Sequence, residues 1–338
     1  MKLLVTGGAG FIGSNFVRYV LNETNWLVIN LDKLTYAGNL ENLVDVKDNP
    51  RYRFIRGDIC DEGLVEGLFA QQKPDAIINF AAESHVDRSI ADASPFISTN
   101  IVGTQVLLEA SRRYEVNKYV QVSTDEVYGS LEDNGEAFSE DTPLAPNSPY
   151  SASKASADLL CRACYRTYRL PVVITRCSNN FGPYQFPEKF IPLVITNALE
   201  DKPIPVYGDG LNVRDWIHVL DHCAGLRLVL EKGIPGEVYN IGGGAQASNL
   251  DLVKRILGII GRPESLSTFV KDRPGHDHRY AINPQKIKEE LGWKLSFEFA
   301  QALADTVAWY INNRHWWSRV KSGEYQEQYR HWYGQPNS

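Results

Sequence analysis

Two neighbouring acids, Asp125 and Glu126, directly follow an apolar, β-branched stretch at residues 118–122. On its own, the heptapeptide STDEVYG (123–129) also fits a strand that ends in a solvated acidic turn. A reaction that moves protons at two neighbouring positions, however, could use one carboxyl group as proton donor and the second as proton acceptor. Environment must then push the two pKa values apart, and adjacent residues suit this because their side chains diverge along a helix or strand. The pair is therefore a candidate acid and base.

Tyr150 and Lys154 form a second chemical pair, spaced four residues apart in a sequence favourable to helix. This spacing places both side chains on one helix face. A neighbouring ammonium stabilises tyrosinate, which lowers the phenol pKa toward the range of a general base. A YxxxK pattern alone is usually a solvated helix face. It gains weight here from Ser123 and Thr124, which close the preceding strand, and from a glycine-rich motif near the N-terminus.

The run TGGAGFIG at residues 6–13 follows a predicted strand and opens a predicted helix. Gly7, Gly10 and Gly13 allow a tight turn and a close approach to a pyrophosphate, for which the helix N-terminus offers free N–H groups. Asp32 ends the next predicted strand. A carboxylate there accepts hydrogen bonds from a ribose 2′-hydroxyl and repels a 2′-phosphate. The motif therefore predicts NAD rather than NADP as the cofactor.

Short apolar runs alternate with helical patterns up to about residue 180, which predicts βαβ units around a parallel sheet. We expect strands at Lys2–Thr6, Trp26–Leu31, Arg53–Arg56, Ala76–Phe80, Tyr119–Ser123 and Val172–Arg176. Helices are expected near Phe11–Leu21, Gly63–Gln71, Phe96–Tyr114 and Tyr150–Tyr168. The predicted fold is α/β: a Rossmann-type doubly wound parallel sheet with a smaller, mixed α/β C-terminal domain for substrate.

Prolines between residues 183 and 205 interrupt this alternation, and a strand at Glu237–Ile241 is expected to return to the main sheet. The predicted NAD-binding Rossmann domain spans residues 1–178 and is rejoined by about 216–243. The substrate domain spans 179–215 and 244–338. The tail after Arg314 carries Trp316, Trp317 and Trp332, which predicts a packed terminal helix.

The composition narrows the range of partners. A formal net charge of −6 argues against nucleic acid and an anionic membrane, because both select basic surfaces. MKLLVTGG is too short an apolar run for a signal peptide. The five cysteines form no disulfide framework, and Cys161 and Cys164 are interpreted as buried thiols rather than as a metal or redox pair. His276 and His278 lack a third ligand. We expect a cytoplasmic protein without a metal site.

Ten segments resemble the extended short-chain dehydrogenases/reductases that act on nucleotide sugars. They are spread along residues 6–277 in the family's order: TGGAGFIGS (6–14), DKLTYAGN (32–39), AAESHVDRS (81–89), TNIVGT (99–104), STDEVYG (123–129), YSASKA (150–155), RCSNNFGPYQFPEK (176–189), RDW (214–216), YNIGG (239–243) and DRPGHD (272–277). The resemblance is closest to members that remove water from dTDP-glucose. It implies a lyase with tightly bound NAD that makes a 4-keto-6-deoxy sugar for deoxysugar (rhamnose-type) biosynthesis.

The resemblance implies roles for five catalytic residues. Tyr150 takes the proton of the sugar 4-hydroxyl as NAD accepts the C4 hydride, and Lys154 tunes Tyr150 and holds the nicotinamide ribose. Thr124 hydrogen-bonds the 4-oxygen. Glu126 then removes the C5 proton, and Asp125 protonates the departing 6-hydroxyl. The hydride finally returns to C6.

Binding residues follow from the resemblance position by position. Those implied for NAD are Gly7, Gly10, Phe11, Ile12, Gly13, Asp32, Lys33, Leu34, Thr35, Asp58, Ile59, Phe80, Ala81, Ala82, Ser84, Thr99, Tyr150, Lys154 and Asn180. Those implied for the nucleotide sugar are Ser84, Thr124, Asn179, Lys189, Phe190, Pro205, Val206, Tyr207, Arg214, Asn249, Asp272, Arg273, Pro274, Gly275 and His276. Arg214 suits a diphosphate because guanidinium offers forked, permanently charged donors, although an ion pair with Asp215 or Asp221 is the alternative.

The family also implies a homodimer packed through helices near residues 99–113 and 150–168, although the apolar residues there could equally face the chain's own sheet. Three other functions are alternatives to the removal of water from dTDP-glucose. A nucleotide-sugar 4-epimerase or decarboxylase needs the Tyr–Lys pair but not the two acids after the strand. A 4,6-dehydratase for a UDP-, CDP- or GDP-sugar differs from the favoured reading only in the nucleotide. An NAD-sensing regulator has no need for all five catalytic residues.

Overall fold

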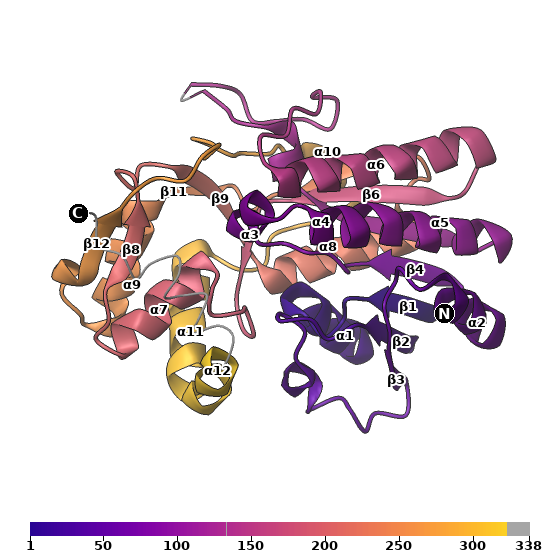
Figure 1. Cartoon of the computed structure of the whole chain (residues 1–338), viewed down its shortest axis with the longest axis horizontal. Helices are drawn as coiled ribbons and strands as arrows, with labels where there is room; N and C mark the ends of the chain where they lie inside the picture. The colour runs from indigo at the N-terminus through magenta and orange to yellow at the C-terminus, as the bar shows by residue number, and fades with distance from the viewer. Residues whose placement is uncertain (133, 323–338) are drawn as a thin grey trace.

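The computed structural model describes residues 1–132 and 134–322 of the chain. At its centre is a seven-stranded sheet in the order β10-β6-β5-β4-β1-β2-β3 (Figure 1). All neighbouring strands are parallel. They are β1 (Lys2–Thr6), β2 (Leu27–Asp32), β3 (Tyr52–Arg56), β4 (Ala76–Asn79), β5 (Lys118–Thr124), β6 (Val172–Cys177) and β10 (Val238–Ile241). The predicted doubly wound sheet is confirmed, and β10 returns to it beside β6 as expected.

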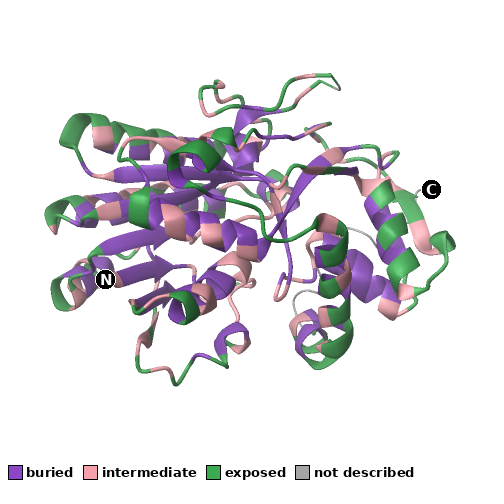
Figure 2. Ribbon diagram, turned by 180° about the vertical axis from the view of Figure 1, so that it is seen from behind, coloured by how far each residue is buried: buried purple, intermediate pink, exposed green. Residues whose placement is uncertain are grey.

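Helices cover both faces of this sheet, as a parallel sheet with apolar residues on both sides requires. On one face, residues of α1 (Phe11–Glu23), α8 (Val219–Lys232) and α10 (Gln285–Leu291) share a core cluster with the strands. On the other face the cluster contains residues of α2 (Glu62–Gln72), α5 (Thr104–Arg113) and α6 (Pro149–Tyr168). Figure 2 shows the buried sheet between helices whose outer sides are exposed. Cys161 and Cys164 lie in the second cluster as free, buried thiols, in agreement with their interpretation.

The predicted single helix at Phe96–Tyr114 is wrong in detail. The segment is divided into α4 (Ser94–Phe96), a π-helical stretch η2 (Ile97–Gly103) and α5. The wider π turns are typical of functional regions and leave backbone or side-chain groups free to bond elsewhere. Here the buried Asn100 donates to the Glu83 carbonyl at 3.0 Å and to Ser153 Oγ at 2.8 Å. The irregularity thus ties this helix to α6 and to the loop after β4.

The smaller part of the molecule lies beside the carboxyl ends of the main strands (Figure 1). It contains a three-stranded sheet of β11 (Ala245–Ser248), β9 (Val213–His218) and β7 (Asn179–Phe181), and a two-stranded sheet of β12 (Ser267–Val270) and β8 (Ile204–Tyr207). Its core adds residues of α7 (Phe190–Leu199), α9 (Asn249–Ile260), α11 (Phe299–Asn312) and α12 (Arg314–Lys321). Trp316 and Trp317 are buried in α12, as predicted, whereas Trp332 and the predicted domain end at 338 lie outside the described residues.

Several short elements connect these layers. The sequence did not predict α3 (Val86–Ala91), which follows β4, nor the 3₁₀ turns η1 (Leu40–Leu43), η3 (Asp125–Tyr128) and η4 (Glu264–Leu266). Over residues 1–132 and 134–322, no helix is both long and apolar enough to cross a membrane. The connection that matters most for chemistry is η3, because it begins where β5 ends.

Candidate active site

A cavity of about 300 Å³ opens at the carboxyl ends of the parallel strands, where doubly wound sheets place their ligands. It is lined by all five predicted catalytic residues and by most of the predicted cofactor set. The predicted residues on its wall are Gly7, Gly10, Phe11, Ile12, Gly13, Asp32, Lys33, Thr35, Asp58, Ile59, Phe80, Ala81, Ala82, Ser84, Thr99, Thr124, Asp125, Glu126, Tyr150, Lys154, Asn179, Asn180 and Lys189.

The other predicted residues are not part of this wall. They are Leu34, Phe190, Pro205, Val206, Tyr207, Arg214, Asn249, Asp272, Arg273, Pro274, Gly275 and His276. Apart from Leu34, all of them belong to the smaller part of the molecule, beyond the cavity. Conversely, sequence reasoning missed Glu83, Gln185 and Phe186, which do line it. Their signal was present, since each lies inside a segment that carries the family resemblance.

The loop between β1 and α1 is shaped for close contact with a ligand. Gly7 has a φ of +69°, and a Cβ added there would lie 2.6 Å from the Ala81 backbone nitrogen. A Cβ on Gly13 would lie 2.3 Å from the Gly7 carbonyl oxygen. Gly10 caps α1 without any side-chain hydrogen bond, and the first turn of the helix holds no acid. The helix therefore presents an open, positive N-terminus toward the cavity, which fits a pyrophosphate.

Asp32 and Asp58 line the cavity at the end of β2 and just after β3. The Asp32 carboxylate accepts hydrogen bonds from the Ala9 nitrogen and the Leu34 nitrogen, both at 2.8 Å, which fixes its orientation. Burial raises the pKa of Asp32, and these two backbone donors oppose that shift. Lys33 Nζ contacts Asp58 Oδ2 at 2.6 Å. An oriented acceptor at the end of β2 fits the ribose of NAD, so the donor set agrees with the predicted cofactor.

Tyr150 and Lys154 lie near the start of α6, both buried. A capping box formed by Ser148 and Ser151 fixes this helix end, and the Tyr150 nitrogen donates to Ser89 Oγ at 3.1 Å. Lys154 Nζ donates to the Val122 carbonyl at 2.7 Å. Burial raises the pKa of Tyr150 well above its ordinary value, and the charges of Glu126 and Asp125 add to the effect.

The predicted lowering of the Tyr150 pKa by Lys154 is therefore not the dominant effect in the structure. Burial lowers the pKa of Lys154 itself, while the nearby Asp158 opposes that change. The desolvation of Tyr150 and two adjacent carboxyl groups outweigh one ammonium that is bonded to a backbone carbonyl. The chain by itself holds Tyr150 as a neutral phenol.

Asp125 and Glu126 occupy η3, with Thr124 as its N-cap. The Thr124 hydroxyl donates to Asp125 Oδ1 at 3.3 Å and accepts from the Glu126 nitrogen at 3.3 Å. Burial raises the pKa of Asp125 well above its ordinary value, and the charges of Glu126 and Asp215 add to it. Burial also raises the pKa of Glu126, but Arg273, Arg214 and Lys189 all oppose the shift.

The two neighbouring acids thus face opposite surroundings. Around Asp125, Glu126 and Asp215 outweigh the opposing charge of Arg214, which favours the neutral form. Around Glu126, the cations Arg273, Arg214 and Lys189 outweigh the opposing charge of Asp277, which favours the ionised form. The neighbouring charges therefore differ in the direction that an acid and a base would need. Asp215, a buried carboxyl whose own pKa burial raises to about 6, contributes to this difference and was not anticipated.

Asn180 and Asn179 line the cavity from β7. The Oδ1 atom of the half-buried Asn179 has no hydrogen-bond partner within the described part of the chain, so it is available to a ligand. Asn180 Nδ2 donates to the Ser178 carbonyl at 2.9 Å, which leaves its Oδ1 to accept from His222 Nδ1 at 2.9 Å. His222 is fully buried on α8, and burial lowers its pKa to about 3.

We expect His222 to make the protein sensitive to acid. Its folded-state pKa is lowered from 6.5, so its stabilising contribution is present above that value and is lost as pH falls toward 3. The expected loss is up to about 1.4 kcal/mol per pH unit below the ordinary pKa. His222→Gln, which can still donate to Asn180, should show a smaller drop in its thermal midpoint between about pH 7 and about pH 5. Equal drops in the two proteins would contradict this prediction.

Arg214 is held by backbone carbonyl groups and an aromatic ring. Its guanidinium donates to the carbonyl oxygens of Val213, Asp277 and His278 at 2.8–3.2 Å and lies 4.4 Å from the centroid of the Tyr280 ring. The alternative of an ion pair with Asp215 or Asp221 is therefore wrong, because backbone carbonyls and an aromatic face hold the side chain instead. Within the described ranges, no group of three or more His, Cys, Asp or Glu residues is arranged to hold a metal ion, and His276 Nδ1 contacts Asp272 Oδ1 at 2.6 Å.

A doubly wound sheet, a glycine-rich turn under α1 and a buried Tyr–Lys pair beside a strand end define a nicotinamide-dependent enzyme of the short-chain dehydrogenase/reductase class. Residues 4–306 match the family described as GDP-mannose 4,6 dehydratase. The chain belongs to this family, whose members here include relatives about half identical to it over nearly their full length.

Three relatives illustrate the similarity. The dTDP-glucose 4,6-dehydratase of Neisseria meningitidis serogroup B is 52% identical, over 96% of this chain and 97% of the relative. The crystal structure of DesIV, a dTDP-glucose 4,6-dehydratase from Streptomyces venezuelae with NAD and TYD bound, is 53% identical, with a TM-score of 0.93 over 95% of this chain and 100% of that one. A UDP-glucose 4-epimerase from Thermotoga maritima with UDP-glucose is 31% identical, with a TM-score of 0.87 over 93% of this chain and 100% of that one.

Proposed function

We propose that this protein is an NAD-dependent dTDP-glucose 4,6-dehydratase, a hydro-lyase that converts dTDP-glucose to dTDP-4-keto-6-deoxyglucose. The observation that carries the proposal is the pair Asp125–Glu126, which lies in the same cavity as Tyr150 and Lys154. The neighbouring charges are mainly negative around Asp125 and mainly positive around Glu126. An epimerase has no use for such a pair. The degree of similarity points the same way, at 52–53% identity to dTDP-glucose dehydratases and 31% to a 4-epimerase.

The residues that line the cavity near α1 and β2 would hold NAD, with its pyrophosphate at the N-terminus of α1 and its adenosine ribose at Asp32. When bound, NAD supplies a positively charged ring that accepts a hydride from C4 and later returns it to C6. The positive charge of that ring would lower the pKa of Tyr150, and the ionised phenol would then accept the proton of the 4-hydroxyl. Thr124 would hold the 4-oxygen by a hydrogen bond. Lys154, anchored to the Val122 carbonyl, keeps a positive charge beside the phenol.

The second half of the reaction belongs to the two acids. A ketone at C4 acidifies the C5 proton, which the ionised carboxylate of Glu126 removes. The neutral carboxyl of Asp125 donates its proton to the 6-hydroxyl, so the C6–O bond breaks and water leaves. Glu126 returns its proton to C5 and is ionised again. The proton that Tyr150 took from the 4-hydroxyl passes to Asp125, which restores all three groups. The burial of both acids excludes bulk water, which favours transfer of protons at these two positions.

Product analysis tests the function directly. Incubation of the purified protein with dTDP-glucose should give dTDP-4-keto-6-deoxyglucose, identified by NMR from the new C6 methyl group. UDP-glucose under the same conditions should be converted much more slowly. Formation of dTDP-galactose would instead establish an epimerase, and faster turnover of UDP-, CDP- or GDP-glucose would reassign the nucleotide.

Three further features belong to this proposal. The NAD-binding domain spans residues 1–178 and about 216–243, and the nucleotide-sugar domain spans 179–215 and 244–338 apart from α10, which packs on the main sheet. The enzyme is cytoplasmic, which suits a nucleotide-sugar substrate. It acts as a homodimer through the helices near 99–113 and 150–168, a choice supported by the large apolar side chains of Ile97, Val102 and Leu159, which are exposed there.

A further inference from the structure

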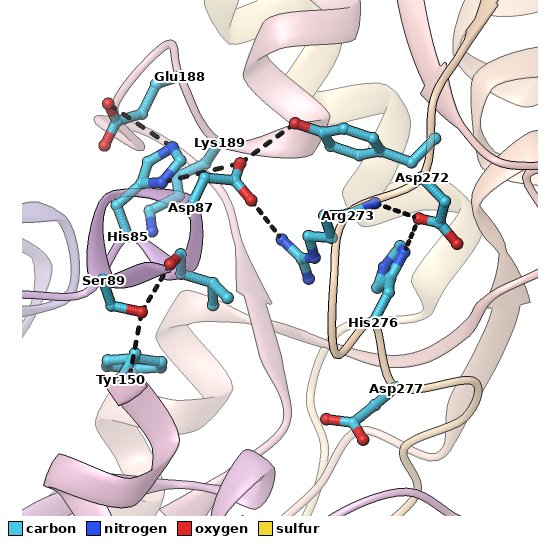
Figure 3. Close-up of polar contacts among 12 residues, drawn as sticks. His85, Asp87, Ser89, Tyr150, Glu188, Lys189, Asp272, Arg273, His276 and Asp277 are labelled. Atoms are coloured by element: carbon cyan, nitrogen blue, oxygen red, sulfur yellow. Dashed lines mark hydrogen bonds and ion pairs between the residues drawn. The ribbon is translucent and has the colours of Figure 1, made fainter. Parts of the chain in front are cut away.

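Asp87 is a buried carboxylate on α3 whose contacts reach across to the smaller part of the molecule. Its side chain is 3% exposed. Oδ1 contacts Arg273 Nη1 at 3.4 Å, and Oδ2 accepts a hydrogen bond from the Tyr207 hydroxyl at 3.2 Å. His85 Nδ1 lies 4.0 Å from Oδ2 on the other side (Figure 3). A carboxylate on the main sheet side thus joins two residues of the nucleotide-sugar set.

Arg273 is the cation in contact with Asp87, and Lys189 adds a second positive charge near it. Burial lowers the pKa of His85 well below its ordinary value, and the charges of Lys189, Arg88 and Arg273 lower it further, so His85 is neutral near pH 7. A buried carboxylate without a positive partner is costly, and removing either member of a buried pair leaves the other uncompensated. Asp87 in turn orients Arg273, because the Asp87 carboxylate is the negative charge with the largest effect on the guanidinium.

The loop that carries Arg273 is braced at three points. Asp272 Oδ1 accepts from the Arg273 nitrogen at 2.9 Å and contacts His276 Nδ1 at 2.6 Å (Figure 3). Asn147 Nδ2, before α6, donates to Asp277 Oδ1 at 2.6 Å. Asp87 is the third point. The loop is therefore docked on the main sheet side by Asn147 and Asp87, and the latter also determines where its guanidinium points.

The same short helix reaches the catalytic tyrosine. Ser89, two residues after Asp87, donates through Oγ to the Val86 carbonyl at 2.6 Å and accepts from the Tyr150 nitrogen at 3.1 Å (Figure 3). One end of α3 is thus attached to the start of α6 and the other to the loop of Arg273. This arrangement fixes the distance between Tyr150, the proposed proton acceptor, and the Arg273 guanidinium. The nucleotide of a sugar held at Tyr150 would extend toward that guanidinium.

We propose that Asp87 is a positioning residue that holds the Arg273 guanidinium and the Tyr207 phenol in the orientation that receives the diphosphate of the nucleotide sugar. The inference rests on the proposed function for the identity of the substrate. Asp87, Arg273 and Tyr207 all lie outside the wall of the 300 Å³ cavity, and Asp87 acts on the ligand through its contacts with the other two.

Asp87→Asn tests the inference, with Asp92→Asn as the matched control. Asp92 is exposed at the C-terminal end of α3, where its Oδ1 accepts from the Ser94 nitrogen, a bond that asparagine preserves. Asp87→Asn should raise the KM for dTDP-glucose and the Kd for dTDP by roughly tenfold each, the size expected for a disturbed charged hydrogen bond. Its kcat should stay within about twofold of the wild type, because no catalytic group is removed. Asp92→Asn should match the wild type in all three quantities.

The coupling to Arg273 distinguishes positioning from a general structural effect. If Asp87 acts through Arg273, Asp87→Asn should add little to the loss in dTDP affinity that Arg273→Gln causes alone. Additive losses would overturn the inference, as would a KM and a dTDP Kd equal to those of Asp92→Asn. Should Asp87→Asn fail to fold, Tyr207→Phe replaces it, with a Kd for dTDP raised about threefold expected and an unchanged Kd contradicting the inference. A wild-type protein that makes no 4-keto-6-deoxy sugar would refute the proposed function, while the dTDP titrations would still decide the role of Asp87.

Discussion

Glu126→Gln should oxidise dTDP-glucose at C4 and then stop. The glutamine keeps the shape of the side chain but cannot accept the C5 proton, so water loss should fall by roughly a thousandfold. Tyr150, Thr124 and Lys154 are untouched, so the first step should persist. We expect reduced nicotinamide to accumulate on the protein after mixing with substrate, measured by its absorbance in stopped flow. The sugar recovered from the protein should be the 4-keto compound that still carries its 6-hydroxyl.

Glu140→Gln is the control for this variant. Glu140 is another partly buried glutamate, whose Oε1 accepts from the Asn240 nitrogen at 2.8 Å, and it does not line the cavity. It should retain turnover of the same order as the wild type. Undiminished dehydration by Glu126→Gln would remove this residue from its role, and the Arg273, Arg214 and Lys189 charges around it would then need another explanation.

Tyr150→Phe should fail one step earlier. The phenol is the only group proposed to take the proton of the 4-hydroxyl, and its loss should slow C4 oxidation by roughly a thousandfold or more. In contrast to Glu126→Gln, no reduced nicotinamide should build up on adding dTDP-glucose. Binding should survive, so the Kd for dTDP should stay near that of the wild type in calorimetry.

Tyr128→Phe is the control for this variant. It removes a buried hydroxyl group from η3, and Tyr128 does not line the cavity. Tyr128 donates to Asn240 Oδ1 at 2.8 Å. This variant should keep activity of the wild-type order even if its thermal midpoint falls. Normal substrate oxidation by Tyr150→Phe would refute the base assignment and shift attention to Thr124.

Local pattern predicted the main sheet well, because each strand and helix there buries a periodic apolar face. The strand at Lys2–Thr6 was predicted to the residue, and the other five strands of the first 180 residues agree within one or two residues at each end. The helix at Phe96–Tyr114 was not predicted correctly. Its π-helical stretch depends on contacts of Asn100 with Glu83 and Ser153, which are distant in the sequence.

The candidate site could also be predicted only in part, because it depends on contacts between segments distant in the sequence. The roles of Asp125 and Glu126 could be posed as a requirement from their spacing and assigned by resemblance, but the charges that separate them come from distant segments. Arg214, Arg273 and Asp215 reach the pair only through the fold. Likewise, nothing in the local pattern indicated that Asp87 would meet Tyr207 and Arg273, or that backbone carbonyls would hold Arg214.

The return of the chain to its first sheet has a consequence for synthesis on the ribosome. The edge strand β10 ends at Ile241, and one apolar face of the sheet is covered by α8 and by α10, which ends at Leu291. A nascent chain of 180 residues therefore carries the glycine-rich turn and all five catalytic residues, but it lacks α8 and α10 and has only α1 on that face. Release of a stable N-terminal half is not expected, and truncated chains should be retained by chaperones until the last helices emerge.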